Sequence, residues 1–152
     1  MLRFIHAADF HLDSAFAALT PRQAAARRRE SRELPVRLAN YVNQNNIDLV
    51  LLAGDLFDSA AAYRDTAEEH SAALAQMEAQ VYIAPGNHDW YGPGSPYLTV
   101  KWPENVHIFT QPRLETMEWP EKNLVLHGAA FTHGEQFDGF LTGFTAPADG
   151  KL

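Results

Sequence analysis

Residues 48–58 read DLVLLAGDLFD and encode a buried strand followed at once by a sharp turn. An unbroken apolar run of strand length is typical of a strand covered on both faces in a parallel sheet. Gly54 lets the backbone turn abruptly after this run and leaves the Asp55 carboxylate exposed at the strand end. The stretch therefore predicts an α/β domain with acidic groups at the carboxyl end of a central strand.

Helices alternate with strands along the first half of the chain. The patterns predict strands over residues 2–8, 48–53 and 81–84, with helical segments over 21–46 and 63–79. This alternation is typical of a parallel sheet covered by helices. Shorter strands are predicted over residues 106–109, 114–119 and 123–126, and little periodicity follows from 127 to 152. No repeat or linker divides the chain, so residues 1–152 are interpreted as one domain.

The first helical segment has a clear start and an apparent break. Thr20 is a good N-cap and Pro21 suits the first helical position. Pro35 is expected to divide the segment into two pieces, because proline removes a backbone donor and clashes with the preceding turn. Apolar spacing predicts core-facing residues in both helical segments: Leu34, Leu38, Tyr41 and Val42 in the first, and Ala67, Leu74 and Met77 in the second.

Composition narrows the class of protein. The 152 residues are 46% hydrophobic, which is enough for one core, and the net charge is −7. This balance argues against a protein that coats nucleic acid through an overall basic surface, but not against a nucleic-acid enzyme, since metal-holding carboxylates are also acidic. The lack of cysteine excludes disulfides and thiolate metal sites. No apolar run approaches the ~20 residues of a membrane span. A cytoplasmic protein is expected.

Metal-ligand side chains follow each of the three predicted parallel strands. Asp9 and His11 come after the first, Asp55 after the second, and Asn87 and His88 after the third. The carboxyl ends of parallel strands form the ligand-binding rim of an α/β sheet, so these side chains are expected to meet. Continued extension would also aim Asp9 and His11 to the same side of the chain.

The donor types indicate which ions such a rim would hold. Carboxylate, amide and imidazole donors together suit Mn²⁺, Fe²⁺ or Zn²⁺ better than Ca²⁺. A carboxylate shared by two ions roughly 3.5–4 Å apart is the arrangement used for phosphoester displacement. Asp-x-His and Gly-Asp alone are weak signals that ordinary turns explain, whereas Gly-Asn-His-Asp is a stronger signal that a turn with a helix-capping Asp also explains. All three in order, each after a predicted strand, favour a metal centre.

Five segments resemble the calcineurin-like metallophosphoesterase superfamily, and within it the DNA repair exonuclease branch of SbcD-like nucleases. They read HAADFHLDS, LAGDLFD, IAPGNHD, WPENVH and HGAAF, at residues 6–14, 52–58, 83–89, 102–107 and 127–131. The resemblance implies an α/β fold in which a central β-sheet sandwich is flanked by helices. It also implies an enzyme that hydrolyses DNA phosphodiesters as an exonuclease, with water activated by two divalent ions, most simply Mn²⁺.

The resemblance assigns roles to matching positions. Asp9 and His11 would bind the first metal ion, Asp55 would bridge both ions, and Asn87 would bind the second. His88 would lie beside the scissile phosphate, where it stabilises the transition state or protonates the leaving oxygen.

Two further aspartates would support these ligands from behind. Asp58 is interpreted as a second layer around the metals, because related nucleases place either Asp or His there. Asp89 is expected to orient the His88 ring, as carboxylate partners commonly do.

The sequence departs from the family pattern at its end. The family completes its site with three further histidines, two of them in a Gly-His-x-His motif, and this motif is absent. His107 and His127 are interpreted as structural and His133 as solvated. We expect a catalytic domain truncated at its C-terminus, with the remaining ligand histidines beyond residue 152 and a weakened second metal site.

Several alternatives stay open for function and partners. The same chemistry also fits a phosphatase or a cyclic-nucleotide phosphodiesterase, and the missing histidines fit an inactive interaction or dimerisation module. The resemblance raises a homodimer and an ATPase partner subunit as expectations, besides DNA. Residues 22–37 carry six arginines and two glutamates, which favours a solvated, ion-paired helix face over a DNA contact. Trp90 and Tyr91 either contact substrate or cap the core.

Overall fold

The core of the computed structural model is a four-stranded, fully parallel sheet in the order β1-β2-β3-β4. The structure describes residues 1–59 and 62–146. The strands are β1 (Phe4–Ala7), β2 (Leu49–Ala53), β3 (Gln80–Ala84) and β4 (Val106–Ile108). Their order follows the chain, so the ends of β1, β2 and β3 lie side by side at one edge, as the sequence predicts.

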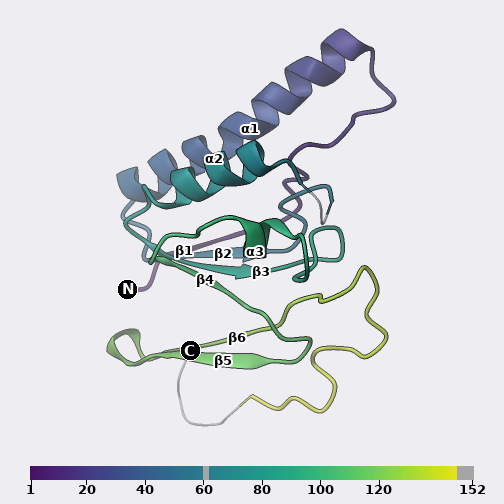
Figure 1. Ribbon diagram of the computed structural model, residues 1–152. Helices are drawn as coiled ribbons and strands as arrows, with labels where there is room; N and C mark the ends of the chain where they lie inside the picture. The colour runs from purple at the N-terminus through teal and green to yellow at the C-terminus, as the bar shows by residue number, and fades with distance from the viewer. Residues whose placement is uncertain (60–61, 147–152) are drawn as a thin grey trace.

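Helices flank this sheet, and a hairpin lies on its other side (Figure 1). The helices are α1 (Pro21–Gln44), α2 (Arg64–Leu74) and the short α3 (Pro96–Thr99). The hairpin pairs β5 (Glu115–Trp119) with β6 (Leu124–Gly128) through a 3-10 turn at Pro120–Lys122. The prediction of a mixed α/β fold with a parallel sheet flanked by helices is confirmed. Residues 129–146 contain no helix or strand, and 147–152 lie outside the described residues.

Helix α1 is continuous, so the predicted break at Pro35 is wrong. The Thr20 backbone N–H donates to Gln23 Oε1 at 3.1 Å and caps the helix start. Pro35 lies on the buried face of α1, where packing against the core offsets the one helical hydrogen bond that its ring removes. Leu34 and Tyr41 were also expected in the core, but they are 37% and 56% exposed.

The buried face of α1 therefore differs from the predicted one. It consists of small or branched residues, namely Ala24, Pro35, Ala39 and Val42. Leu34 and Tyr41 lie at other positions around the helix axis, so their side chains face solvent.

One apolar cluster fills the space between the helices and the sheet. Its members come from α1, α2, β2, β3 and the loops that follow the strands, and they include Val42, Val50, Phe57, Leu74 and Ile83. Ala67, Leu74 and Met77 are buried as predicted, although α2 ends before Met77. Within residues 1–59 and 62–146, no helix combines the length and the apolar character that crossing a membrane requires.

Candidate metal centre

Backbone hydrogen bonds continue the parallel pairing of β1 and β2 into the loops beyond them. Asp9 N–H donates to the Gly54 carbonyl at 3.1 Å, and His11 N–H donates to the Asp55 carbonyl at 3.0 Å. These bonds hold the two loops together before any ligand is bound. The side chains of Asp9, His11 and Asp55 are therefore presented from a fixed frame.

The loops hold several residues in left-handed backbone conformations. Asp9, His11 and Asp55 have φ values of 58°, 44° and 53°, and Gly54 has 84°. Continued extension after β1 is thus the wrong expectation for Asp9 and His11. Left-handed conformations cost energy in residues other than glycine, and they persist where the surroundings over-determine them, often at functional sites.

The first donor group consists of Asp9, His11 and Asp55. One ligand atom from each lies within 4.8 Å of the others, and His11 Nε2 is 3.8 Å from Asp9 Oδ1. The Asp9 side chain is exposed, whereas His11 and Asp55 are half-buried. The group is therefore open to solvent on one side and anchored on the other.

The second donor group consists of His11, Asp58 and His88, whose ligand atoms also lie within 4.8 Å of one another. Asp58 Oδ1 is 2.9 Å from His11 Nδ1. A carboxylate bound to one ring nitrogen fixes the tautomer and leaves the other nitrogen for a metal. His11 thus belongs to both groups and joins them, with Nε2 facing Asp9.

His88 is held against both neighbouring loops. Its backbone N–H donates to Asp55 Oδ1 at 3.0 Å, and its ring Nδ1 is 3.4 Å from the Asp58 carbonyl oxygen. The rings of His88 and His11 meet edge to face with centroids 4.9 Å apart. Asn87 lies one residue before His88 and is exposed. The structure therefore brings all three predicted motifs together at the sheet edge.

Asp89 corrects the sequence-based expectation. Its buried carboxylate binds backbone N–H groups rather than the His88 ring: it accepts from Gly86 at 2.7 Å and Leu56 at 2.8 Å, and from Asp55 and Phe57 at 3.2 Å. The Tyr97 hydroxyl donates a further bond to it at 2.5 Å. Asp89 therefore clamps the loops after β2 and β3 together, and it reaches the metal ligands only through their backbone.

Sequence reasoning missed Tyr97. The short spacing from Asp89 gives no signal, because α3 brings Tyr97 back under the loop only in the folded chain.

Gly86 is required by the same close packing. A Cβ atom on Gly86 would lie 2.2 Å from Asp55 Oδ1 and 2.5 Å from Asp55 N, closer than any real contact. A side chain at residue 86 would displace the Asp55 carboxylate from the first donor group. The glycine before Asn87 is thus explained by the room that Asp55 needs.

The donor set fits divalent metal ions. Carboxylate and imidazole groups converge within 4.8 Å with no basic side chain among them. The carboxylates of Asp9 and Asp55 lie in the same group, and two carboxylates held this close repel one another, so a bound cation would relieve that repulsion. A mixed oxygen and nitrogen set suits transition ions better than Ca²⁺.

A comparison with protein families identifies the family of the chain. A family described as calcineurin-like phosphoesterase matches residues 2–150. The chain belongs to this family. Its members bind divalent ions and hydrolyse phosphoesters, and the two donor groups are the candidate ligands here. An uncharacterized metallophosphoesterase of Bacillus subtilis strain 168, YhaO, is 39% identical over 115 residues. That match covers 72% of this chain but 28% of YhaO, so the chain spans less than a third of that relative's length.

The other histidines of this phosphoesterase lie outside the two donor groups. His107 packs against Tyr82 and Phe109, and His127 packs against Phe144. His133 is exposed and stacks on Trp90 with an interplanar angle of 17°.

His70, which the sequence analysis did not single out, is fully buried. Aromatic rings meet it edge to face, and no hydrogen-bond partner reaches either ring nitrogen within the described residues.

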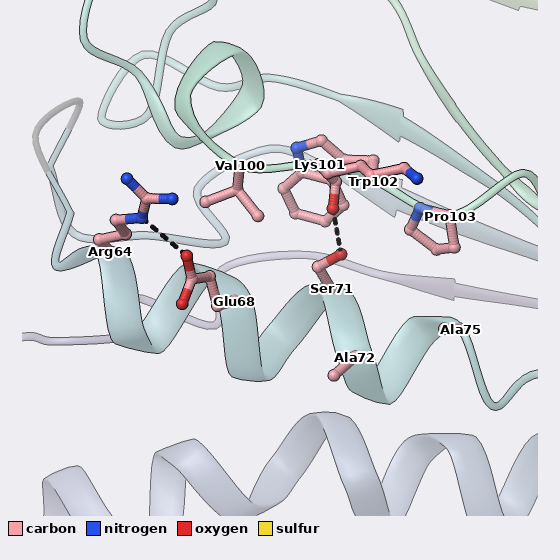
Figure 2. A pocket seen from close by; sticks show the side chains of 9 residues that line it. All are labelled: Arg64, Glu68, Ser71, Ala72, Ala75, Val100, Lys101, Trp102 and Pro103. Carbon is pink, nitrogen blue, oxygen red and sulfur yellow. Dashed lines mark hydrogen bonds and ion pairs between the residues drawn. The ribbon is translucent and has the colours of Figure 1, made fainter.

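A hollow of about 380 Å³ lies apart from the phosphoesterase centre, between α2 and residues 100–103 (Figure 2). Its polar groups already pair with one another: Arg64 bonds Glu68 at 2.7 Å, and the Ser71 hydroxyl donates to the Lys101 carbonyl at 2.8 Å. None of the metal-ligand candidates lines it. This hollow is therefore separate from the donor groups at the sheet edge.

Proposed function

We propose that the protein hydrolyses phosphodiester bonds in DNA with two divalent metal ions. The observation that carries this proposal is the donor group of Asp9, His11 and Asp55 at the carboxyl edge of a parallel sheet, with the His88 ring packed against His11 beside it. Family membership supports phosphoester hydrolysis in general. The choice of DNA rests on the resemblance of the three motifs and their flanks to DNA repair exonucleases.

Five side chains would hold the ions and the phosphate. Asp9 and His11 would hold the first ion, Asp55 would be shared by both, Asn87 would hold the second, and His88 would contact the phosphate. Mn²⁺ fits this mixture of oxygen and nitrogen donors, and Fe²⁺ and Zn²⁺ fit it too. When bound, such ions lower the pKa of a water molecule and neutralise charge on the phosphate oxygens.

His88 acts on the leaving oxygen. Its Nδ1 faces the Asp58 carbonyl oxygen, which accepts a hydrogen bond from Nδ1–H and fixes the ring plane. In the protonated ring, Nε2–H then remains to hydrogen-bond the phosphate or to pass its proton to the leaving oxygen. The packing of His88 against His11 keeps this proton next to the metal ligands.

A substrate comparison tests the proposal. We expect Mn²⁺-dependent cleavage of single- or double-stranded DNA oligonucleotides, and slower turnover of a small phosphomonoester and of a cyclic nucleotide. Faster turnover of either small substrate would instead favour a phosphatase or a cyclic-nucleotide phosphodiesterase, which the family membership equally allows.

His88→Ala separates metal binding from chemistry. The variant should bind Mn²⁺ as the original protein does, measured by calorimetric titration, and should lose cleavage by at least two orders of magnitude, since general acid–base groups contribute about 10²–10⁴-fold. Loss of Mn²⁺ binding would mean that His88 is a ligand rather than the proton donor.

A further inference from the structure

The N-terminal half of α1 concentrates positive charge in an acidic protein. Six arginines lie between residues 22 and 37, whereas the whole chain has a net charge of −7. Two of them form the expected helix pairs, Arg27 with Glu30 at 2.7 Å and Arg29 with Glu33 at 3.4 Å. Even with both glutamates and Asp13 counted against the six arginines, a net charge of +3 remains on this surface.

Part of this charge surrounds a hollow. A depression of about 270 Å³ is lined by Ala25, Arg28, Arg29 and Arg32, and by no carboxylate. Ala25 contributes only a methyl group to this lining, and the Arg29 side chain is 85% exposed. Three arginines at one depression suit an anion with several oxygens, because guanidinium binds phosphate through paired N–H donors.

The hollow is tied to the loop that carries the first metal ligands. Arg28 donates to the Ala15 carbonyl at 3.2 Å, and Arg32 binds Asp13 Oδ1 at 2.7 Å. Asp13 follows His11 by two residues and also accepts from the Thr66 hydroxyl of α2 at 2.9 Å. These bonds fix the hollow relative to the metal centre.

The placement of α1 suits a ligand that reaches both sites. Figure 1 shows its N-terminal end projecting beyond α2, on the side of the molecule where the parallel strands end. Arg22 extends the basic surface by two helical turns, about 10 Å, past Arg29. A chain of phosphates can contact several such points in succession, whereas a single small anion occupies one.

We propose that this hollow, lined by Ala25, Arg28, Arg29 and Arg32, binds a backbone phosphate of a nucleic-acid strand whose scissile phosphate lies at the metal centre. The inference rests on the proposed function for the identity of the strand. The acidic remainder of the molecule repels a polyanion, so α1 determines the side from which the strand approaches.

The chain offers a matched pair of variants. Arg29 and Arg27 are both exposed and both paired with a glutamate on α1, but only Arg29 lines the hollow. Arg29→Gln should weaken binding of a fluorescein-labelled single-stranded oligonucleotide about 3- to 10-fold in fluorescence anisotropy without metal. It should also make the slope of log K against log salt concentration shallower by about 0.7, which is the contribution of one phosphate contact on a single strand. Arg27→Gln should change neither.

A second pair tests the hollow without removing an arginine. Ala25→Glu places a carboxylate in the hollow and should weaken binding of the oligonucleotide at least as much as Arg29→Gln does. Ala25→Gln introduces a side chain of similar size without the charge and should weaken this binding less. Equal effects of Arg29→Gln and Arg27→Gln would overturn the inference. So would oligonucleotide affinity that is insensitive to Ala25→Glu, or a poly-glutamate peptide that binds as tightly as the oligonucleotide.

The hollow and the metal centre can fail separately. Arg29→Gln and Ala25→Glu should leave Mn²⁺-dependent hydrolysis of bis(p-nitrophenyl) phosphate unchanged, since this substrate is too short to reach α1. If the original protein does not hydrolyse that diester, the proposed function fails, and the metal-free binding series still decides whether the hollow holds a phosphate. If hydrolysis occurs but the binding series shows no difference, only the hollow is wrong.

Discussion

The contact between Asp58 and His11 determines which imidazole nitrogen faces the donor groups. With Nδ1 bound to the Asp58 carboxylate at 2.9 Å, Nε2 is left toward Asp9. Both side chains of this contact are about one-third exposed, so burial alone does not fix the orientation of the His11 ring, and the bond to Asp58 is needed.

Asp58→Ala is expected to weaken Mn²⁺ binding about 10- to 100-fold, the usual effect of removing such a partner. Asp58→Asn should lose less Mn²⁺ affinity, because its amide oxygen can still accept a hydrogen bond from the Nδ1–H of His11. Calorimetric titration measures both. The exposed Asp138 provides a control, and Asp138→Asn should bind Mn²⁺ like the original protein. Unchanged affinity in Asp58→Ala would show that the contact does not orient a metal ligand.

At the scale of elements, Asp89 and Tyr97 join the ends of β2 and β3 to α3. Tyr97 is 5% exposed, and burial, followed by the nearby Asp89 charge, raises the pKa of its hydroxyl well above the ordinary value. The hydroxyl therefore stays protonated and donates to the Asp89 carboxylate. This single bond connects an element of four residues to the loop that carries His88.

Tyr97→Phe should lower the free energy of unfolding by about 1.5–3 kcal/mol, the range for a hydrogen bond to a charged group. The loss stays within that range because four backbone N–H groups still satisfy the carboxylate. Urea denaturation measures the change. Tyr63 is 68% exposed, so Tyr63→Phe is the matched control and should change stability by less than 0.5 kcal/mol. An equal effect of the two substitutions would contradict the clamp.

The sequence predicts the elements better than it predicts how they meet. Alternation of apolar strands and helices is a local signal, and it places the parallel sheet and the three loops correctly. The helix through Pro35 depends instead on tertiary packing that outweighs a local penalty, which no local pattern records. The same limit applies to Asp89, because its three partners in the loop after β2 lie more than 30 residues away.

For the candidate site, residue types indicate the chemistry but leave the geometry open. The left-handed conformations of Asp9 and His11 arise from hydrogen bonds to the next loop, so a strand pattern cannot foresee them. The link from Asp13 to Arg32 is equally hidden, since its partners are 19 residues apart in different elements.

At the scale of the whole molecule, His70 couples folding to pH. It lies in the core with its ring against Phe10, Phe57 and Trp102, and burial lowers its pKa from 6.5 to about 4. The folded protein therefore holds His70 neutral, while the unfolded chain binds a proton below about pH 6.5. Stability from this residue is complete above pH 6.5 and falls as the pH drops toward 4.

The size of this effect follows from the shift. A difference of about two and a half pKa units corresponds to about 3 kcal/mol of unfolding free energy, lost between pH 6.5 and 4. His70→Leu should remove that part of the pH dependence, and at pH 7.5 it should be neutral or stabilising, because it replaces two buried nitrogens that lack partners. Urea denaturation at pH 7.5, 6, 5 and 4.5 measures how the unfolding free energy depends on pH in the original protein and in His70→Leu.

The hydrogen bond from Lys122 lowers the pKa of Asp48 below 3.8, so the stability that Asp48 contributes is present above that pH and disappears only below it, outside the range of His70. His133 is exposed and lies outside the core, so His133→Gln is the control and should keep the pH dependence of the original protein. If the unfolding free energy of His70→Leu depends on pH as steeply as that of the original protein, the acid sensitivity arises elsewhere. If the dependence is weaker in His70→Leu, the acid sensitivity arises in the core, where Phe10 and Phe57 support the metal loops.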